Sequence, residues 1–144
     1  MMPLHSDEQS LGLLLSRTYL AYKKKVTQLL SSLDITPEQF GILHQLSKYE
    51  GMSQKKLANI HERDQTSIGK TLERLEKKQL IARHVDPADR RAVVVHLTEE
   101  GVALLQQAEP IMERLDHDIY DRYQGKADHS LQDAVNHIYE NLSD

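Results

Sequence analysis

Apolar residues recur at helical spacing in the middle of the chain, most clearly between residues 64 and 79. Ile68, Leu72 and Leu75 follow the i, i+4, i+7 spacing of one buried stripe, which predicts an amphipathic helix over this range. The opposite face carries hydroxyls and long charged side chains: Thr66, Lys70, Glu73 and Lys77, with Ser67 and Arg74 at its edge. Such a face suits the major groove of DNA, where hydroxyls and cations reach base edges. It also fits an ordinary solvated face, because Glu and Lys at i, i+4 form a surface ion pair.

The preceding segment favours the DNA-binding interpretation of this helix. Ser53 can cap a short helix over residues 54–61, and Glu62 and Arg63 connect that helix to Asp64, the cap of the next one. Two short helices joined in this way, the second with a polar outer face, form a helix-turn-helix pattern. The residues of the first helix expected to face the core are Leu57, Ala58 and Ile60.

A β-hairpin is predicted directly after these two helices. Residues 80–85 and 92–97 read as strands, because apolar and β-branched residues alternate in the second of them. Residues 86–91 between the strands are polar and turn-prone. The hairpin therefore carries Asp89, Arg90 and Arg91 near its tip.

Two amphipathic helices are predicted before this module. The first, over residues 8–33, has apolar positions that step by 4, 3, 4, 3 and 4, as along a heptad seam: Leu15, Tyr19, Tyr22, Val26, Leu29 and Leu33. Thr36, Pro37 and Gln39 begin the second, since they provide a cap, a first-turn proline and the partner of a capping box. It should run to about Tyr49 and turn three side chains inward: Phe40, Leu43 and Leu46.

Two more helices are predicted after the hairpin. One begins at Thr98 and ends near residues 124–126, and Pro110 should kink or break it because proline cannot donate a backbone hydrogen bond. Its expected buried stripe is Val102, Leu105, Met112, Leu115 and Ile119. The last helix, over residues 130–142, has apolar spacing of 4, 3 and 4 at Leu131, Val135, Ile138 and Leu142. The terminal helices have more apolar surface than a small domain can cover, so we expect them to form a dimer interface.

Charge and composition narrow the class of protein. The chain of 144 residues has a net charge of −4, but residues 53–98 hold ten basic and six acidic residues, net +4, which leaves eight basic and sixteen acidic residues, net −8, elsewhere. A basic module within an acidic scaffold is typical of a local DNA-facing surface. No eighteen-residue apolar run and no signal peptide are visible, and there is no cysteine. These features fit a cytoplasmic protein without disulfides.

Residues 57–101 resemble the MarR family of bacterial transcription regulators. The matching features are Leu57-Ala58, the run from Leu72 to Ile81, Asp86-Pro87, Asp89-Arg90-Arg91, and Leu97-Thr98 followed by Gly101. The order of the flanking helices is similar as well, so the resemblance covers nearly the whole chain. In one departure, Gln79 stands where the family usually has the glycine that closes the recognition helix.

The resemblance implies a mainly helical fold with a small β-hairpin, made of a winged helix-turn-helix domain and a helical dimerisation region. Residues 1–35 would supply an N-terminal dimerisation helix, residues 36–98 the DNA-binding domain, and residues 99–144 the C-terminal dimerisation helices. The protein would be a homodimeric regulator, a repressor, that binds a pseudo-palindromic double-stranded DNA operator. Its expected DNA-binding residues are Gln54, Lys55, Gln65, Thr66, Ser67, Lys70, Thr71, Arg74, Arg90 and Arg91. Asp89 would orient one of the wing arginines.

A small phenolic or acidic effector is expected to change the affinity for DNA. Arg17, Tyr19, Tyr22, His44 and Met112 could supply a cation, hydroxyls and soft apolar surface for it. The two tyrosines also lie on the heptad seam, where they could simply pack in the dimer.

Other function classes fit the sequence less well. Eight histidines invite a metal-responsive regulator, but no HxxxH or HExxH pair is present, and we expect no metal and no cofactor. The absence of a phosphate loop or a nucleophile motif argues against an enzyme. A winged helix used for protein interaction rather than for DNA binding remains the alternative. The basic helix face and hairpin count against it.

Overall fold

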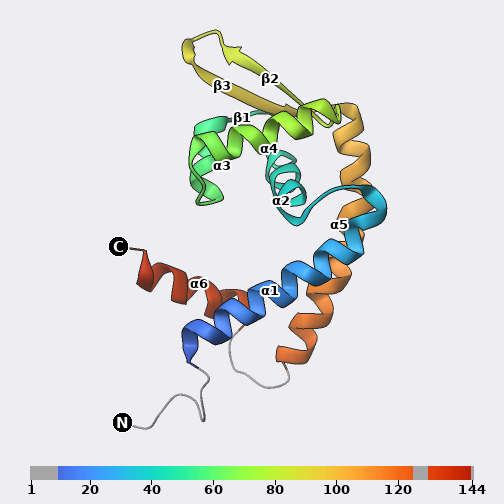
Figure 1. Ribbon diagram of the computed structural model, residues 1–144, viewed down its shortest axis with the longest axis vertical. Coiled ribbons are helices and arrows are strands. Elements are labelled where there is room, and N and C mark those ends of the chain that lie inside the picture. The colour runs from blue at the N-terminus through green and yellow to red at the C-terminus, as the bar shows by residue number, and fades with distance from the viewer. Residues whose placement is uncertain (1–9, 125–129, 144) are drawn as a thin grey trace. The chain divides into compact units, whose positions relative to one another are not determined.

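The computed structural model describes residues 10–124 and 130–143 as a mainly helical fold with a three-stranded antiparallel sheet (Figure 1). The helices and strands follow in chain order: α1 (Leu11–Leu30), the 3-10 helix η1 (Ser31–Leu33), α2 (Pro37–Leu46), β1 (Met52–Ser53), α3 (Gln54–Ile60), α4 (Gln65–Lys77), β2 (Ile81–Asp86), β3 (Asp89–Leu97), α5 (Glu99–Gln124) and α6 (Leu131–Leu142). Residues 1–108 and 109–144 form two compact units. The predicted start of the first helix at residue 8 and the predicted end of the fifth at residues 125–126 lie outside the described residues.

The core of the first unit is aliphatic and is built around α4. Ile68, Leu72 and Leu75 are fully buried, which confirms the predicted stripe. Helices α1, α2 and α3 and strand β3 contribute the other large side chains that are fully buried: Val26, Leu30, Ile42, Leu43, Leu46, Leu57 and Val95. Burying a Leu, Ile or Val side chain contributes about 1.5–3 kcal/mol. This stripe therefore fixes which face of α4 points outward.

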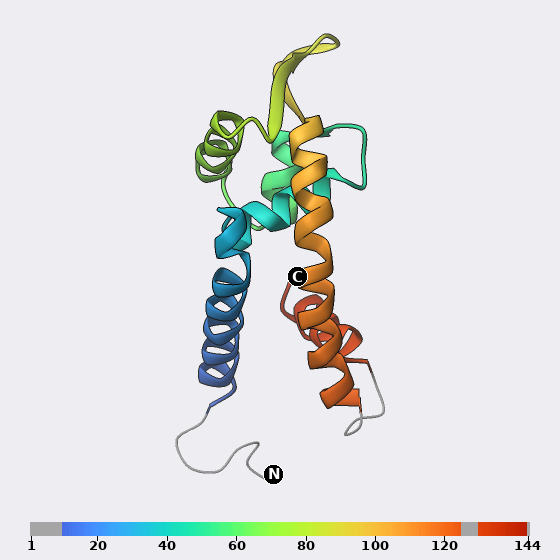
Figure 2. The same cartoon turned by 90° about the vertical axis from the view of Figure 1, so that its right-hand side faces the viewer.

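The predicted hairpin is present, and it lies in a sheet with strand order β1-β3-β2. Strands β2 and β3 pair antiparallel from Ile81 opposite Leu97 to Asp86 opposite Asp89, with an irregularity between Val85 and Asp86. Figure 2 shows the hairpin extending beyond helices α3 and α4. The two-residue strand β1, which pairs with β3, was not predicted because so short a segment has no measurable periodicity.

Side chains cap helices α2 and α3 as the sequence predicts. The Gln39 backbone N–H donates to the Thr36 hydroxyl at 3.1 Å, and the Thr36 N–H donates to Gln39 Oε1 at 3.2 Å, which confirms the capping box of α2. Ser53 caps α3 by accepting from the Lys56 N–H at 3.0 Å. These caps satisfy backbone donors that have no partner within the helix.

Helix α4 ends in a left-handed turn at Gln79, whose φ is 64°. The Leu80 N–H donates to the Leu75 carbonyl at 3.1 Å, and the Gln79 N–H donates to the Glu76 carbonyl at 2.9 Å. These two bonds make a Schellman motif, in which the left-handed residue is usually glycine. The departure from the family pattern at Gln79 therefore changes the side chain at this turn but not the path of the backbone.

The first turn of α5 is tied to the end of α4 by Thr98. The Thr98 hydroxyl donates to the Gln79 carbonyl at 2.6 Å and accepts from the Gly101 N–H at 3.0 Å. Gly101 is required at this contact, because a Cβ at this position would lie 2.1 Å from the Leu80 carbonyl oxygen. The Leu97-Thr98 and Gly101 pattern that led to the family resemblance thus serves one close approach between two chain segments.

The helices differ from the expectations in several details. Ile60 of α3 and Val102 of α5 are exposed instead of facing the core, whereas Leu105 and Met112 of the same α5 stripe are buried as predicted. Pro110 lies inside a continuous α5, so the helix is not broken there, and the kink that the sequence predicts as the alternative stays a prediction. Helix α2 ends at Leu46 rather than near Tyr49. Leu15 and Tyr19 of the seam predicted for α1 are exposed on the single chain, as residues of a dimer interface would be, whereas Leu30, which the seam omits, is fully buried.

Both terminal helices leave large apolar side chains exposed on the single chain. In α1 these are Leu11, Leu13, Leu14, Leu15, Tyr19 and Leu20. In α6 they are Val135, Ile138, Tyr139 and Leu142. Several large apolar side chains exposed on one helix are typical of an interaction site. Among the described residues, no helix is both long enough and apolar enough to cross a bilayer.

The substitution Gly101→Ala should lower the free energy of unfolding by about 1–3 kcal/mol, the usual range for overpacking, because the added methyl group meets the Leu80 carbonyl. Gly12→Ala is the matched control, since a Cβ there meets no atom within 4 Å and alanine favours a helix. Chemical denaturation of both variants measures the difference. An unchanged midpoint for Gly101→Ala would show that the contact is not close in solution.

The substitution Gln79→Gly should raise the free energy of unfolding by about 0.5–1 kcal/mol. Glycine removes the left-handed backbone strain of about 1–2 kcal/mol, offset in part by its greater freedom in the unfolded chain. The melting temperature of Gln79→Gly is compared with that of Gln79→Ala, which keeps the Cβ, so the difference reports this net backbone effect alone. Equal melting temperatures for the two variants would contradict it.

Candidate nucleic-acid interface

Helix α4 presents a polar face that its buried stripe holds toward solvent. Its N-cap Asp64 accepts from the Ser67 N–H at 2.8 Å and from the Ser67 hydroxyl at 3.1 Å. These bonds lower the pKa of Asp64, so the cap is ionised at neutral pH. The exposed residues of this face are Gln65, Thr66, Lys70, Glu73, Arg74 and Lys77. Glu73 and Lys77 form the expected i, i+4 ion pair at 3.6 Å, and Lys70 and Arg74 place two more cations on this face.

Thr71 is turned inward, which corrects its expected role in DNA contact. Its side chain is only 7% exposed, and its hydroxyl donates to Glu38 Oε1 at 2.6 Å. A buried hydroxyl that already donates inside the protein cannot also reach a groove. The i, i+3 position of Thr71 beside the buried Ile68 could have indicated this placement from the sequence.

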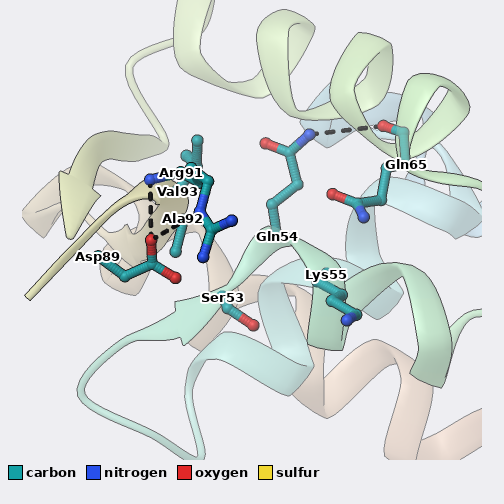
Figure 3. A pocket seen from close by; sticks show the side chains of 8 residues that line it. All are labelled: Ser53, Gln54, Lys55, Gln65, Asp89, Arg91, Ala92 and Val93. Atoms are coloured by element: carbon teal, nitrogen blue, oxygen red, sulfur yellow. Dashed lines mark hydrogen bonds and ion pairs between the residues drawn. The ribbon is translucent and has the colours of Figure 1, made fainter.

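Gln54 links three elements of the module, so its side chain is engaged within the protein. Its amide nitrogen donates to the Gln65 carbonyl at 3.4 Å, and its amide oxygen accepts from Arg83 Nη1 at 3.4 Å (Figure 3 shows the first bond). Arg83 of β2 also contacts Glu76 of α4, with Nη2 3.1 Å from Oε1. Arg83 thereby joins the hairpin to α4. Sequence reasoning missed this residue, because an arginine in a strand carries no pattern of its own.

A small cavity of about 180 Å³ lies where the start of α3 meets the hairpin. Its lining residues are Ser53, Gln54, Lys55, Gln65, Asp89, Arg91, Ala92 and Val93. In Figure 3 the Arg91 side chain approaches the Gln54 side chain from the hairpin, while Gln65 faces Gln54 from α4. Lys55 and Arg91 bring two cations to this cavity. A backbone phosphate is a suitable occupant, because it is anionic and accepts hydrogen bonds from several donors.

Asp89 holds Arg91 in place at the tip of the hairpin. Its Oδ1 accepts from the Arg91 backbone N–H at 3.0 Å and lies 3.5 Å from Arg91 Nε. This confirms that Asp89 orients a wing arginine. The Arg91 side chain is still 94% exposed, and Arg90 is exposed as well. Two arginines on a projecting hairpin are suited to a narrow, negative minor groove.

A second cavity, of about 320 Å³, lies between α1, the start of α2 and the α3–α4 connection. Its lining residues are Tyr19, Tyr22, Lys23, Pro37, Glu38, His61 and Arg63. The expected ligand residues are thus only partly brought together. Tyr19 and Tyr22 line the cavity, whereas Arg17, His44 and Met112 are not among its lining residues. Sequence reasoning missed the four polar members, which belong to three separate segments.

The polar groups of this second cavity contact α4 and the segment before it. Glu38, in the first turn of α2, pairs with Arg63 of the α3–α4 connection and accepts from Thr71 of α4. Burial lowers the pKa of His61, although Glu38 acts in the opposite direction, so the neutral ring is favoured at neutral pH. Its Nε2 is buried and has no hydrogen-bond partner among the described residues. The described part of the chain also holds no group of three residues suited to bind a metal ion.

Comparison with known sequences shows the family and its usual role. The sequence model of the MarR family matches residues 35–93. The HTH-type transcriptional regulator YdcH of Bacillus subtilis is 33% identical over 109 residues, which cover 73% of this chain and 74% of that protein. Four curated relatives are named as transcriptional regulators, and this chain spans 65% to 74% of their lengths.

Solved structures with similar folds cover nearly the whole chain. The Bordetella bronchiseptica protein BpsR, whose DNA binding is regulated by 6-hydroxynicotinic acid, is 29% identical with a TM-score of 0.78, and the match covers 99% of both chains. Staphylococcus aureus MepR, solved as a complex with DNA, is 25% identical with a TM-score of 0.83, and the match covers 96% of this chain and 98% of MepR.

Proposed function

The chain belongs to the MarR family of transcriptional regulators, and from this membership we propose that it binds a pseudo-palindromic DNA operator as a homodimer and represses transcription. The observation that carries the proposal is the joint geometry of α4 and the hairpin. The buried stripe holds the cations of α4 outward, Asp89 holds Arg91, and Arg83 ties the two elements together. The curated relatives are named as regulators, and we infer that this chain is not an enzyme and acts in the bacterial cytoplasm, where the DNA is.

Each element of the module takes a distinct part in the proposed DNA contact. Residues at the start and along the exposed face of α4 enter the major groove: Gln65, Thr66, Ser67, Lys70 and Arg74. Lys55 and Arg91 bind backbone phosphates around the small cavity, while Arg90 follows the minor groove. Thr71 is left out of this set, and Gln54 acts by holding α3 against α4 rather than through a direct contact. The complex of MepR with DNA supports this use of the fold.

The exposed apolar faces of α1 and α6 support a homodimer. They would be covered by the same faces of a second copy, in agreement with the proposed division into residues 1–35, 36–98 and 99–144. A two-fold axis would then present two recognition helices to successive major grooves, about 34 Å apart. This symmetry accounts for the palindromic form of the proposed operator.

The second cavity fits a hydroxylated aromatic acid as the effector. Its volume of about 320 Å³ is at the lower end of the range of about 300–1,000 Å³ for small-molecule pockets, which suits a single ring. Lys23 and Arg63 would bind the carboxylate, and the rings of Tyr19 and Tyr22 would pack against the aromatic ring. The regulation of BpsR by 6-hydroxynicotinic acid supports this class of ligand.

Selection of genomic fragments by the purified protein tests the proposed function. We expect enrichment of one palindromic sequence whose half-sites lie about one helical turn apart. In the bound fragments, Arg74→Ala should relax the preference at one position in each half-site, at a cost of about 1–3 kcal/mol. Recovery of fragments without a shared sequence would favour the alternative, a winged helix that serves protein interaction.

The substitution Arg91→Ala should weaken binding to every operator sequence and reduce the salt dependence of the affinity. Loss of one phosphate contact lowers the slope of log K against log salt by about 0.9 for each site, because one fewer counterion is released. Titrations by fluorescence anisotropy at several salt concentrations measure this slope. Arg122→Ala removes the same charge from α5 and should leave the slope unchanged. The same slope in Arg91→Ala and the unmodified protein would contradict the phosphate contact.

A further inference from the structure

A single carboxylate, that of Glu38, joins the proposed effector cavity to the recognition helix. Its Oε1 accepts from the Thr71 hydroxyl in the middle of α4 at 2.6 Å. Its Oε2 pairs with Arg63 in the connection between α3 and α4. Glu38 and Arg63 also line the cavity, whereas Thr71 does not. A change inside the cavity can therefore reach α4 through one residue.

The two contacts of Glu38 differ in their access to solvent. Thr71 is 7% exposed, so its bond to the carboxylate is shielded and charge-assisted, which makes it the stronger kind of hydrogen bond. The side chains of Arg63 and Glu38 are 39% and 32% exposed, so water and other anions can compete for their ion pair. The pair with Arg63 is therefore the contact that a ligand can break first.

Thr71 has a second acceptor within reach. Its hydroxyl lies 3.4 Å from the Ser67 carbonyl, one turn earlier in α4. If the Glu38 carboxylate moves away, the hydroxyl can donate to this carbonyl, and no buried donor is left without a partner. A threonine that bonds back to the preceding turn tends to bend its helix. Thr71 thus offers α4 two hydrogen-bonded arrangements.

We propose that Glu38 is the positioning residue that couples the effector to DNA binding. While Glu38 is paired with Arg63, it holds α4 through its hydrogen bond with Thr71. An aromatic carboxylate in the cavity pairs with Arg63 instead, and Glu38 then releases Thr71. This inference rests on the proposed function, because it requires the effector of that class. In the free protein the charged side chains of the cavity, Lys23, Arg63 and Glu38, sum to +1 when His61 is neutral. An entering carboxylate is attracted by the two cations and repelled by Glu38.

Thermodynamic linkage makes the effect reciprocal. If the ligand weakens the hold on α4, the operator must weaken ligand binding by the same factor. The difference between the two arrangements of Thr71 supplies the differential interaction that any such coupling requires.

Four variants test the coupling. Glu38→Gln keeps an oxygen that can accept from Thr71 but loses the ion pair, and Thr71→Val removes the hydroxyl at nearly constant volume. Thr71→Ser restores the hydroxyl as the conservative rescue. Glu113→Gln removes one exposed carboxylate from α5 and serves as the charge-matched control. Thermal unfolding confirms that each variant is folded.

The first experiment measures the operator Kd with and without 6-hydroxynicotinate, and again with 4-hydroxybenzoate as a second probe. Calorimetry then measures the affinity of the free protein for each ligand. We expect the ligand to weaken operator binding of the unmodified protein, Thr71→Ser and Glu113→Gln by about 5- to 150-fold, the usual range of coupling. In Glu38→Gln and Thr71→Val this ratio should fall below about threefold, while Glu38→Gln binds the free ligand more tightly because Arg63 is no longer paired. A full ratio in both variants would overturn the proposal and leave the proposed function intact.

A second experiment needs no ligand, so it tests the coupling role of Glu38 separately from the proposed effector class. Arg63→Met and Thr71→Val, alone and combined, form a double-mutant cycle on operator affinity. Because both residues act through Glu38, their losses should be smaller in combination than their sum. Additive losses, or no loss, would overturn the coupling role of Glu38. If the unmodified protein binds neither acid but the cycle is non-additive, the effector class is wrong and the link through Glu38 stands.

Discussion

The burial of one apolar stripe on α4 is the constraint on which the DNA-binding surface depends. Three fully buried side chains, Ile68, Leu72 and Leu75, fix the rotation of this helix about its own axis. Since a helix residue points about 100° away from its neighbour, fixing three positions fixes all the others. The polar face of α4 is therefore set by hydrophobic packing that takes no part in DNA contact. A rotation of this helix by one residue would bury Arg74 in one direction, or Glu73 and Glu76 in the other, at a large cost in desolvation.

Polar contacts then position α4 relative to its neighbours. Arg83 ties it to the hairpin, Gln54 ties it to α3, and Glu38 ties it to α2. Each of these contacts is directional, so it specifies an orientation that apolar packing alone leaves adjustable. The hairpin and the two helices can consequently meet DNA as one surface. The contact to α2 differs from the others because one of its partners also lines a cavity.

The sequence predicted the features that depend on residues close together in the chain. The amphipathic periodicity of α4, the capping box at Thr36 and Gln39, and the alternation in β3 each lie within a few residues, and the structure has all three. Contacts between residues far apart in the chain could not be predicted from the sequence. The contact between Thr71 and Glu38 joins residues 33 positions apart, and that between Arg83 and Gln54 joins residues 29 apart. Without these contacts Thr71 was predicted to bind DNA, and only Tyr19 and Tyr22 of the expected ligand residues line the second cavity.

The joint of Thr98, Gly101 and Leu80 restricts where residues can be inserted into the chain or deleted from it. The Thr98 hydroxyl bridges the end of α4 and the first turn of α5, and only a glycine fits against Leu80 there. An inserted residue on either side of this joint would shift one partner out of register with the other. The tip of the hairpin at Pro87 and Ala88, by contrast, is exposed. Insertions and deletions among related proteins should accordingly occur at the tip of the hairpin. The length of the hairpin can then change during evolution, while the number of residues at the joint of Thr98, Gly101 and Leu80 stays constant.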